Sequence, residues 1–203
     1  MQLIGMLDSP YVRRAAISLR MLGVPFEHRS LSVFRDFDAF HAINPLVKAP
    51  TLVCDDGAML VDSSLIIDYA ETLAKRSLLP SEPATRRHAL RLTGLALVAC
   101  EKAAQHFYEL MRAANLRDAA WQQRVHGQLH DACALLDAAL CAVPADRWLC
   151  GESVTQADIS VGVAWTFTQI IAADIVSASD YPAFAGFAAR AERLPEFAAL
   201  PPA

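Results

Sequence analysis

The strand-like segments of this 203-residue chain all lie before about residue 76, and this restricts the folds that the chain can adopt. Residues 1–7 form a short apolar run, and residues 25–33 alternate between polar and apolar side chains. Residues 51–62 contain two apolar runs on either side of Asp56-Gly57, a dipeptide typical of hairpin turns. A sheet must therefore be built from the first part of the chain alone.

Two helical patterns are interleaved with these strands. Residues 10–22 carry apolar side chains at helical spacing and are followed by Gly23, a residue that commonly ends helices. Residues 63–73 repeat the spacing, whereas residues 36–46 form a less regular link. Because strand–helix–strand connections within one sheet are right-handed crossovers, we expect the first two strands to be parallel.

After residue 76 the strand signals disappear, and the chain becomes rich in alanine and leucine. Helical spacing is found at residues 86–112, 119–142, 155–173 and 181–193. The sequence therefore predicts an α/β domain at residues 1–76, a proline-containing linker at 77–87 and an all-helical domain at 88–203.

Composition and charge exclude several classes of protein. The net charge is −4 and no block of Lys or Arg exceeds a pair, which argues against nucleic acid as a partner. No apolar run reaches the ~18 residues of a membrane helix. The five cysteines show neither a CxxC motif nor zinc-type spacing, so we expect buried thiols, no bound metal and a soluble cytoplasmic protein.

Ser9-Pro10 opens the first predicted helix directly after the first strand. Serine is a favoured N-cap and proline a favoured first helical residue, so a purely structural role is sufficient to explain the pair. Ligands of open α/β sheets, however, bind at the carboxyl ends of strands. A hydroxyl at the positive end of a helix can donate to an anion such as a thiolate, and Tyr11 offers a second hydroxyl nearby.

Pro50 stands at the beginning of a predicted strand, in NPLVKAPTLV. It cannot donate a ladder hydrogen bond, so it must start the strand, form a bulge or lie in a cis turn. A cis turn would leave the backbone of Ala49 free to pair with a peptide ligand, and Lys48 would bring a cation to the same place.

Asp62 and Ser63 are candidate caps of the helix that follows the hairpin, in LVDSSLIIDYAE. Capping alone would explain them. A helix N-terminus with a hydroxyl and a carboxylate also suits the end group of an amino acid, because Ser63 and the N–H groups can bind its carboxylate and Asp62 its ammonium.

These motifs, in this order, resemble those of the glutathione transferase superfamily. The resemblance rests on SPYVRR after the first strand, on NPLVKAPTLV, on VDSSLIIDYAE and on CGESVTQADISVGVAW in the second half. It implies a thioredoxin-like domain, with a mixed four-stranded sheet and helices, followed by an all-helical domain. In the fourth motif, Thr155 and Asp158 form a helix-capping pair that we interpret as structural.

The resemblance also implies a glutathione site in the first domain. Ser9 matches the position at which serine-type members stabilise the glutathione thiolate, and Lys48, Ala49, Pro50, Asp62 and Ser63 match glutathione-binding positions. Val47 stands where many members have glycine, which restricts the loop that carries Lys48. No cysteine occupies position 9, which argues against a cysteine-dependent redox mechanism.

The function implied is that of a detoxifying glutathione S-transferase, with glutathione as co-substrate, a small hydrophobic electrophile as second substrate and a homodimeric assembly. Tyr11, Tyr108, Met111 and Trp165 are candidates for the second-substrate pocket, with core packing as the alternative for those on helices. A glutathione-dependent isomerase, dehalogenase or disulfide reductase, or a non-catalytic relative of these enzymes, would retain the same motifs.

Several charged residues are given no functional role. His126 and His130 stand four residues apart beside Asp131, a spacing compatible with a metal, but no third ligand follows and we interpret them as surface histidines. Arg13 and Arg14 are interpreted as solvated or paired helix charges.

Overall fold

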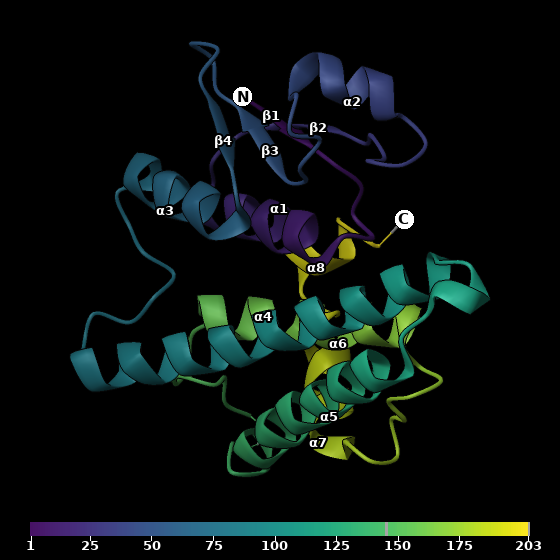
Figure 1. Cartoon of the computed structure of the whole chain (residues 1–203). Coiled ribbons are helices and arrows are strands. Elements are labelled where there is room, and N and C mark those ends of the chain that lie inside the picture. Colours follow the sequence, from purple (N-terminus) through teal and green to yellow (C-terminus); the bar gives the residue numbers. More distant parts are fainter. Residues whose placement is uncertain (145, 203) are drawn as a thin grey trace. The chain divides into compact units, whose positions relative to one another are not determined.

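The computed structural model describes residues 1–144 and 146–202, and the chain divides into two compact units. The sheet unit comprises Met1–Leu78 together with the segment from Leu194 onward. The helical unit comprises the residues between them, Leu79–Arg193. In Figure 1 the strands belong to the first unit and the long helices to the second.

The sheet unit contains β1 (Gln2–Ile4), α1 (Pro10–Leu22), β2 (Glu27–Arg29), α2 (Phe37–Ile43), β3 (Thr51–Val53), β4 (Met59–Val61), α3 (Ser63–Ala74) and α8 (Pro195–Ala198). The helical unit contains α4 (Pro83–Met111), the 3-10 helix η1 (Ala114–Leu116), α5 (Ala119–Cys141), α6 (Gln156–Ile171) and α7 (Pro182–Ala191).

The four strands form one sheet in the order β2-β1-β3-β4. β1 is parallel to β2 and antiparallel to β3, and β4 is antiparallel to β3. Leu3, at the centre of β1, lies opposite His28 on one side and Leu52 on the other. The mixed four-stranded sheet, the parallel first pair and the all-helical second half are therefore confirmed.

Two helices begin where the sequence pattern is weak. The segment 36–46 contains α2, whose only buried residue is Phe40, so no repeating apolar face announces the helix. α4 begins at Pro83, inside the segment predicted as linker. Proline is favourable at the first helical position, and the Glu82 carboxylate accepts from two backbone N–H groups of the first turn.

The C-terminal segment belongs to the sheet unit, although the sequence placed residues 88–203 in the helical domain. Arg13 Nε donates to the backbone oxygen of Leu200 at 2.8 Å, and the guanidinium group lies 5.5 Å from the centre of the Phe197 ring. Arg13 is therefore a buried side chain that ties α8 to α1, and not a solvated helix charge.

Asp158 joins the start of α6 to the loop before it. Its carboxylate is buried and accepts from the backbone N–H of Leu149 at 2.8 Å, the backbone N–H of Thr155 at 2.8 Å and the Thr155 hydroxyl at 2.7 Å. The expected capping pair is thus present, with an additional bond to Leu149 that the sequence did not reveal.

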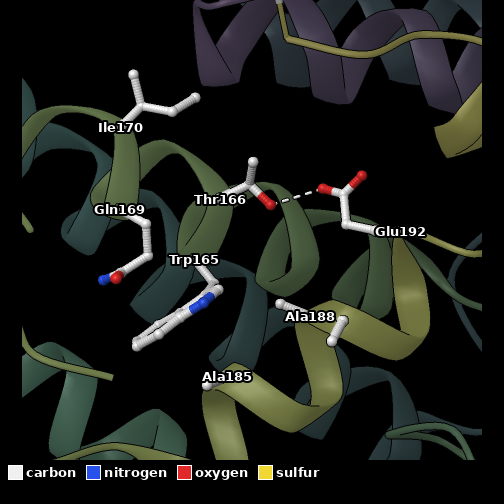
Figure 2. A pocket seen from close by; sticks show the side chains of 8 residues that line it. Trp165, Thr166, Gln169, Ile170, Ala185, Ala188 and Glu192 are labelled. Carbon is white, nitrogen blue, oxygen red and sulfur yellow. Dashed lines mark hydrogen bonds between the residues drawn. The ribbon is translucent and has the colours of Figure 1, made fainter. Parts of the chain in front are cut away.

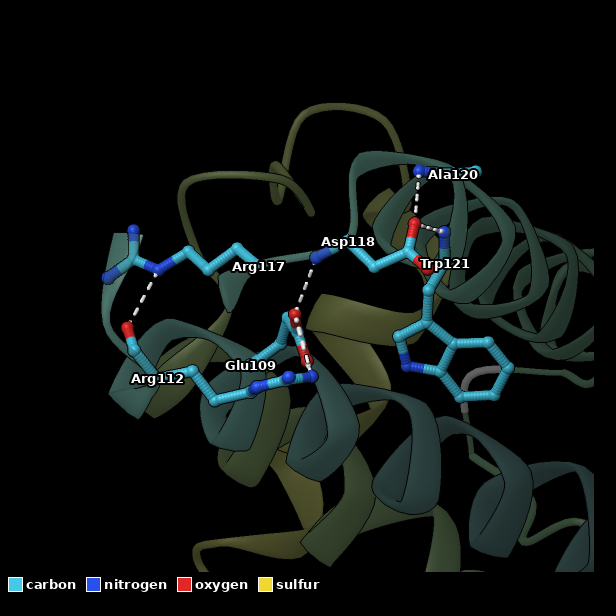
Figure 3. Close-up of polar contacts among 6 residues, drawn as sticks. All are labelled: Glu109, Arg112, Arg117, Asp118, Ala120 and Trp121. Carbon is cyan, nitrogen blue, oxygen red and sulfur yellow. Dashed lines mark hydrogen bonds and ion pairs between the residues drawn. The ribbon is translucent and has the colours of Figure 1, made fainter. Parts of the chain in front are cut away.

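A second carboxylate closes the connection between α4 and α5, as Figure 3 shows. Glu109 is buried near the end of α4, where it accepts from the backbone N–H of Asp118 at 2.8 Å and forms an ion pair with Arg112 at 3.2 Å. Asp118, which is exposed, in turn caps α5 by accepting from the N–H groups of Ala120 and Trp121. The turn through η1 is therefore fixed at both ends.

Three histidines contact one another or a tyrosine between α4, α5 and the segment before α7. His106 Nδ1 lies 3.0 Å from His126 Nε2, and His106 Nε2 lies 3.6 Å from the carboxylate of Asp174. His130 Nδ1 lies 2.8 Å from the hydroxyl of Tyr181. His126 and His130 are half-buried and bonded, so their interpretation as surface histidines is wrong.

The five cysteines differ in their exposure to solvent. Cys54, Cys100 and Cys133 are buried as expected, whereas Cys141 is exposed and Cys150 is half-buried. Burial raises the pKa of the Cys133 thiol to about 12, so this thiol stays protonated at neutral pH.

Within the described residues, no helix combines the length and apolarity that crossing a membrane requires.

Replacing Asp158 by alanine should lower the free energy of unfolding by about 3 kcal/mol or more, because two buried N–H groups lose their acceptor. The matched control is Asp118→Ala, which removes an exposed cap and should cost about 1 kcal/mol. Urea unfolding of both variants measures the difference. Equal losses would show that burial of the Asp158 carboxylate carries no extra stabilisation.

The free energy of unfolding should fall as the pH is lowered from about 7 towards 5. Burial, reinforced by neighbouring His106 and His130 and opposed by Asp174, lowers the pKa of His126 from its ordinary value of 6.5. A lowered pKa means that the folded chain prefers the neutral ring, so stability is fully present above 6.5 and declines below it. His126→Gln should flatten this decline in unfolding experiments across the pH range; an unchanged slope would contradict the assignment.

Candidate functional site

The hydroxyl of Ser9 lies at the N-terminus of α1, where this helix follows the carboxyl end of β1. Ser9 is the N-cap, and its Oγ accepts from the backbone N–H of Val12 at 3.5 Å. This distance is at the outer limit of a hydrogen bond. The Ser9 hydroxyl acts only as an acceptor in this bond, so its O–H remains available to donate to another group. Ser9 is half-buried, as is Tyr11 in the first turn.

The bond between Ala49 and Pro50 is cis, so of the three structures considered for Pro50 the cis turn is the one present. Pro50 also immediately precedes β3. Within the described residues, neither the N–H nor the C=O of Ala49 takes part in a hydrogen bond. Ala49 is half-buried, and its backbone groups are therefore free to pair with a ligand.

Gly5 brings the cis turn and the start of α1 together. A Cβ atom at this position would lie 2.6 Å from Cγ2 of Val12 and 3.1 Å from the Cβ of Ala49, and the backbone of Gly5 has a φ of +135°. Only glycine fits both the space and the backbone conformation. Because Gly5 has no side chain, Ala49 can lie close to the first turn of α1.

Lys48 is exposed and precedes this turn. The residue before it, Val47, has a φ of +46°, which is the left-handed conformation that glycine adopts most easily. Valine thus adopts a left-handed conformation here at the cost of local strain, which a glycine at this position would avoid.

A third group of predicted residues lies at the N-terminus of α3. Asp62 is the N-cap, and its carboxylate accepts from the backbone N–H of Ser64 at 2.7 Å. Ser63 is buried and its hydroxyl accepts from Nη1 of Arg14 at 2.8 Å. Nη1 also lies 3.1 Å from the hydroxyl of Ser64.

Arg14 is the residue that the sequence interpretation missed. It is 3% exposed, and its contacts join the middle of α1 to the start of α3. The sequence signal for this role is an arginine on the inner face of a helix. Residues 10–22 contain three arginines at different angles around the helix, so the sequence alone does not single out Arg14. Arg14 places positive charge beside the helix N-terminus of α3, which favours an anionic ligand there.

The candidate second-substrate residues of the helical unit, Tyr108, Met111 and Trp165, have different surroundings within that unit. Trp165 is buried against Phe184, with ring centres 4.9 Å apart, and lines a groove of about 320 Å³ between α6 and α7 (Figure 2). At one side of the groove, the Thr166 hydroxyl donates to Glu192 at 2.6 Å. Tyr108 and Met111 are exposed on α4 and do not line this groove.

The described residues contain no cluster of three or more histidine, cysteine, aspartate or glutamate side chains arranged to hold a metal ion. The candidate site groups in the sheet unit are hydroxyls, backbone amides, two cations and the carboxylate of Asp62. This set suits an anionic, peptide-like molecule better than a metal.

Two protein-family models match this chain. Residues 3–78 match the family model of the glutathione S-transferase N-terminal domain, and residues 119–190 match that of the C-terminal domain. The two matched segments together span more than two thirds of the chain.

Individual relatives are distant. The uncharacterized GST-like protein YibF of Escherichia coli is 31% identical over 97 residues, which are 47% of this chain and 48% of that protein, so the chain spans about half the length of this curated relative. A probable maleylacetoacetate isomerase of Caenorhabditis elegans is 27% identical over 151 residues, 73% of this chain and 69% of that protein.

A solved structure matches the whole chain. The glutathione S-transferase of Methylobacterium radiotolerans, in complex with glutathione sulfonate, is 26% identical with a TM-score of 0.88, covering 100% of this chain and 95% of that one. The two domain models, this full-length likeness and the sheet unit with its cis-proline turn show that the chain belongs to the glutathione S-transferase superfamily.

Proposed function

We propose that this protein is a glutathione S-transferase that binds glutathione on the sheet unit and activates its thiol through Ser9. The observation that carries the proposal is the free backbone of Ala49, which lies close to the first turn of α1 because Gly5 has no side chain. A peptide that pairs with Ala49 would extend past the Ser9-capped helix N-terminus. The bound glutathione sulfonate in the Methylobacterium radiotolerans relative supports the same class of ligand.

Activation of the thiol is the chemical task of such a site. A free thiol with a pKa near 8.5 is only a few per cent thiolate at pH 7, and the thiolate is the nucleophile. The Ser9 hydroxyl would donate to the sulfur, and the N-terminus of α1 would add favourable positive potential. The thiol proton leaves to solvent, the thiolate forms a C–S bond with an electrophilic carbon, and the displaced leaving group departs with its electron pair.

The other end of glutathione would be bound at α3. Its γ-glutamyl end carries a carboxylate and an ammonium group, which Ser63 and Asp62 complement, and Arg14 strengthens the positive potential behind Ser63. Lys48 and Pro50 complete the proposed glutathione site. A hydrophobic electrophile as second substrate, a homodimer and a cytoplasmic location are parts of the proposal that rest on family membership.

A glutathione-dependent isomerase is the second candidate. It is favoured by the similarity to a probable maleylacetoacetate isomerase over 73% of this chain. Both reactions begin with attack by the thiolate, but an isomerase releases glutathione unchanged. Product analysis with an aryl halide and with a cis-enedione acid separates them: a stable conjugate indicates a transferase, and an isomerised acid with no loss of glutathione indicates an isomerase.

Replacing Ser9 by alanine should raise the pKa of bound glutathione by about one unit or more and lower kcat/KM at neutral pH about tenfold, because a hydrogen bond to a charged group is lost. The thiolate absorbance in the ultraviolet, followed across pH in the protein–glutathione complex, measures the pKa. Asp118→Ala, which also removes a helix cap, serves as control and should leave that pKa unchanged. If Ser9→Ala also leaves it unchanged, Ser9 is only a cap.

A further inference from the structure

Two fully buried polar side chains link the ends of the loop that carries Lys48 and Ala49. Asn44 follows α2, Thr51 begins β3, and both are 0% exposed. Nδ2 of Asn44 donates to Oγ1 of Thr51 at 2.8 Å, and that hydroxyl donates to the backbone oxygen of Lys48 at 2.6 Å. Two successive hydrogen bonds thus connect Asn44, at the start of the loop, to Thr51 at its end, and Thr51 to Lys48 in its middle.

Asn44 also fixes the first half of the loop. Its Oδ1 accepts from the backbone N–H of Leu46 at 2.9 Å, and its backbone oxygen accepts from the N–H of Val47 at 2.9 Å. Its own N–H donates to Phe40 in the last turn of α2 at 2.8 Å. One asparagine therefore sets the path of the chain on both sides.

These bonds hold a conformation that the loop would not choose by itself. Val47 is β-branched and has a φ of +46°, a region in which such residues are outliers. Strained backbone of this kind persists only where the surroundings determine it fully. Thr51 supplies a rigid anchor, because it pairs with Ile4 of β1 on one side and with Val61 of β4 on the other.

We propose that Asn44 and Thr51 are positioning residues for the peptide ligand: they clamp the loop so that Lys48 and the free backbone of Ala49 are presented in one geometry. This inference rests on the proposed binding of glutathione. Without the clamp, Val47 can leave the left-handed region, and the residues that follow it move. The competent loop is then only one of several conformations, and the apparent affinity falls by the fraction that is competent.

The clamp acts on binding and not on the thiol. Thr51 lies in β3 and Asn44 directly after α2, whereas the proposed activating group, Ser9, caps α1 and makes its own bond to Val12. Loss of the clamp should therefore raise KM for glutathione and leave kcat and the pKa of the bound thiol nearly unchanged.

The test compares three variants of the full chain. Thr51→Val keeps the shape of the side chain and removes the hydroxyl, and Thr51→Ser retains the hydroxyl. Thr168→Val is the matched control: Thr168 is equally buried, and its hydroxyl donates to the backbone oxygen of Ala164 at 2.8 Å, within α6 of the helical unit. Calorimetric titration with reduced glutathione gives Kd, and steady-state kinetics give KM and kcat.

We expect Thr51→Val to weaken glutathione binding about fivefold or more, Thr51→Ser to restore most of the affinity, and Thr168→Val to bind as the wild type does. Amide hydrogen exchange at Leu46 and Val47 should accelerate in Thr51→Val alone, with or without glutathione. Wild-type affinity in Thr51→Val, or equal weakening by Thr168→Val, would overturn the inference while leaving the proposed function intact. Absence of binding by the wild type would overturn the proposed function and this inference together.

Discussion

The close approach at Gly5 is the constraint on which the proposed site depends. At this residue the chain leaves β1 with a backbone that only glycine adopts readily, and a single methyl group would collide with Val12 and press against Ala49. The contact unites three segments that are distant in the sequence: the end of the first strand, the start of α1 and the cis-proline turn. A larger residue there would separate the Ser9 cap from the free backbone of Ala49.

α1 extends this arrangement across the sheet unit. Its first residue is capped by Ser9, Arg14 contacts the serines that open α3, and Arg13 holds the C-terminal segment through Leu200. A single helix thus positions both ends of the proposed ligand site. The helical unit has its own fixed points, the buried carboxylates of Glu109 and Asp158, which are satisfied by backbone N–H groups of neighbouring turns.

Local patterns were sufficient to predict the sheet, the main helices and the cis turn as one of three alternatives, because each has a short-range signature. The hairpin follows from Asp56-Gly57, and the end of α1 from Gly23. Contacts between distant segments carry no such signature. Nothing near Arg14 in the sequence indicates Ser63, nothing near Asn44 indicates that its amide reaches Thr51, and the pairing of His126 with His106 depends on how α4 and α5 pack. The single buried residue of α2 likewise left that helix without a pattern.

The central claim is that the sheet unit binds glutathione and ionises its thiol. Calorimetric titration of the purified protein with reduced glutathione, repeated near neutral pH in two buffers of different ionisation enthalpy, tests it most directly. The account predicts binding accompanied by proton release, seen as a heat that changes with the buffer, because the bound thiol becomes a thiolate. Absence of binding, or binding with the same heat in both buffers, would contradict it.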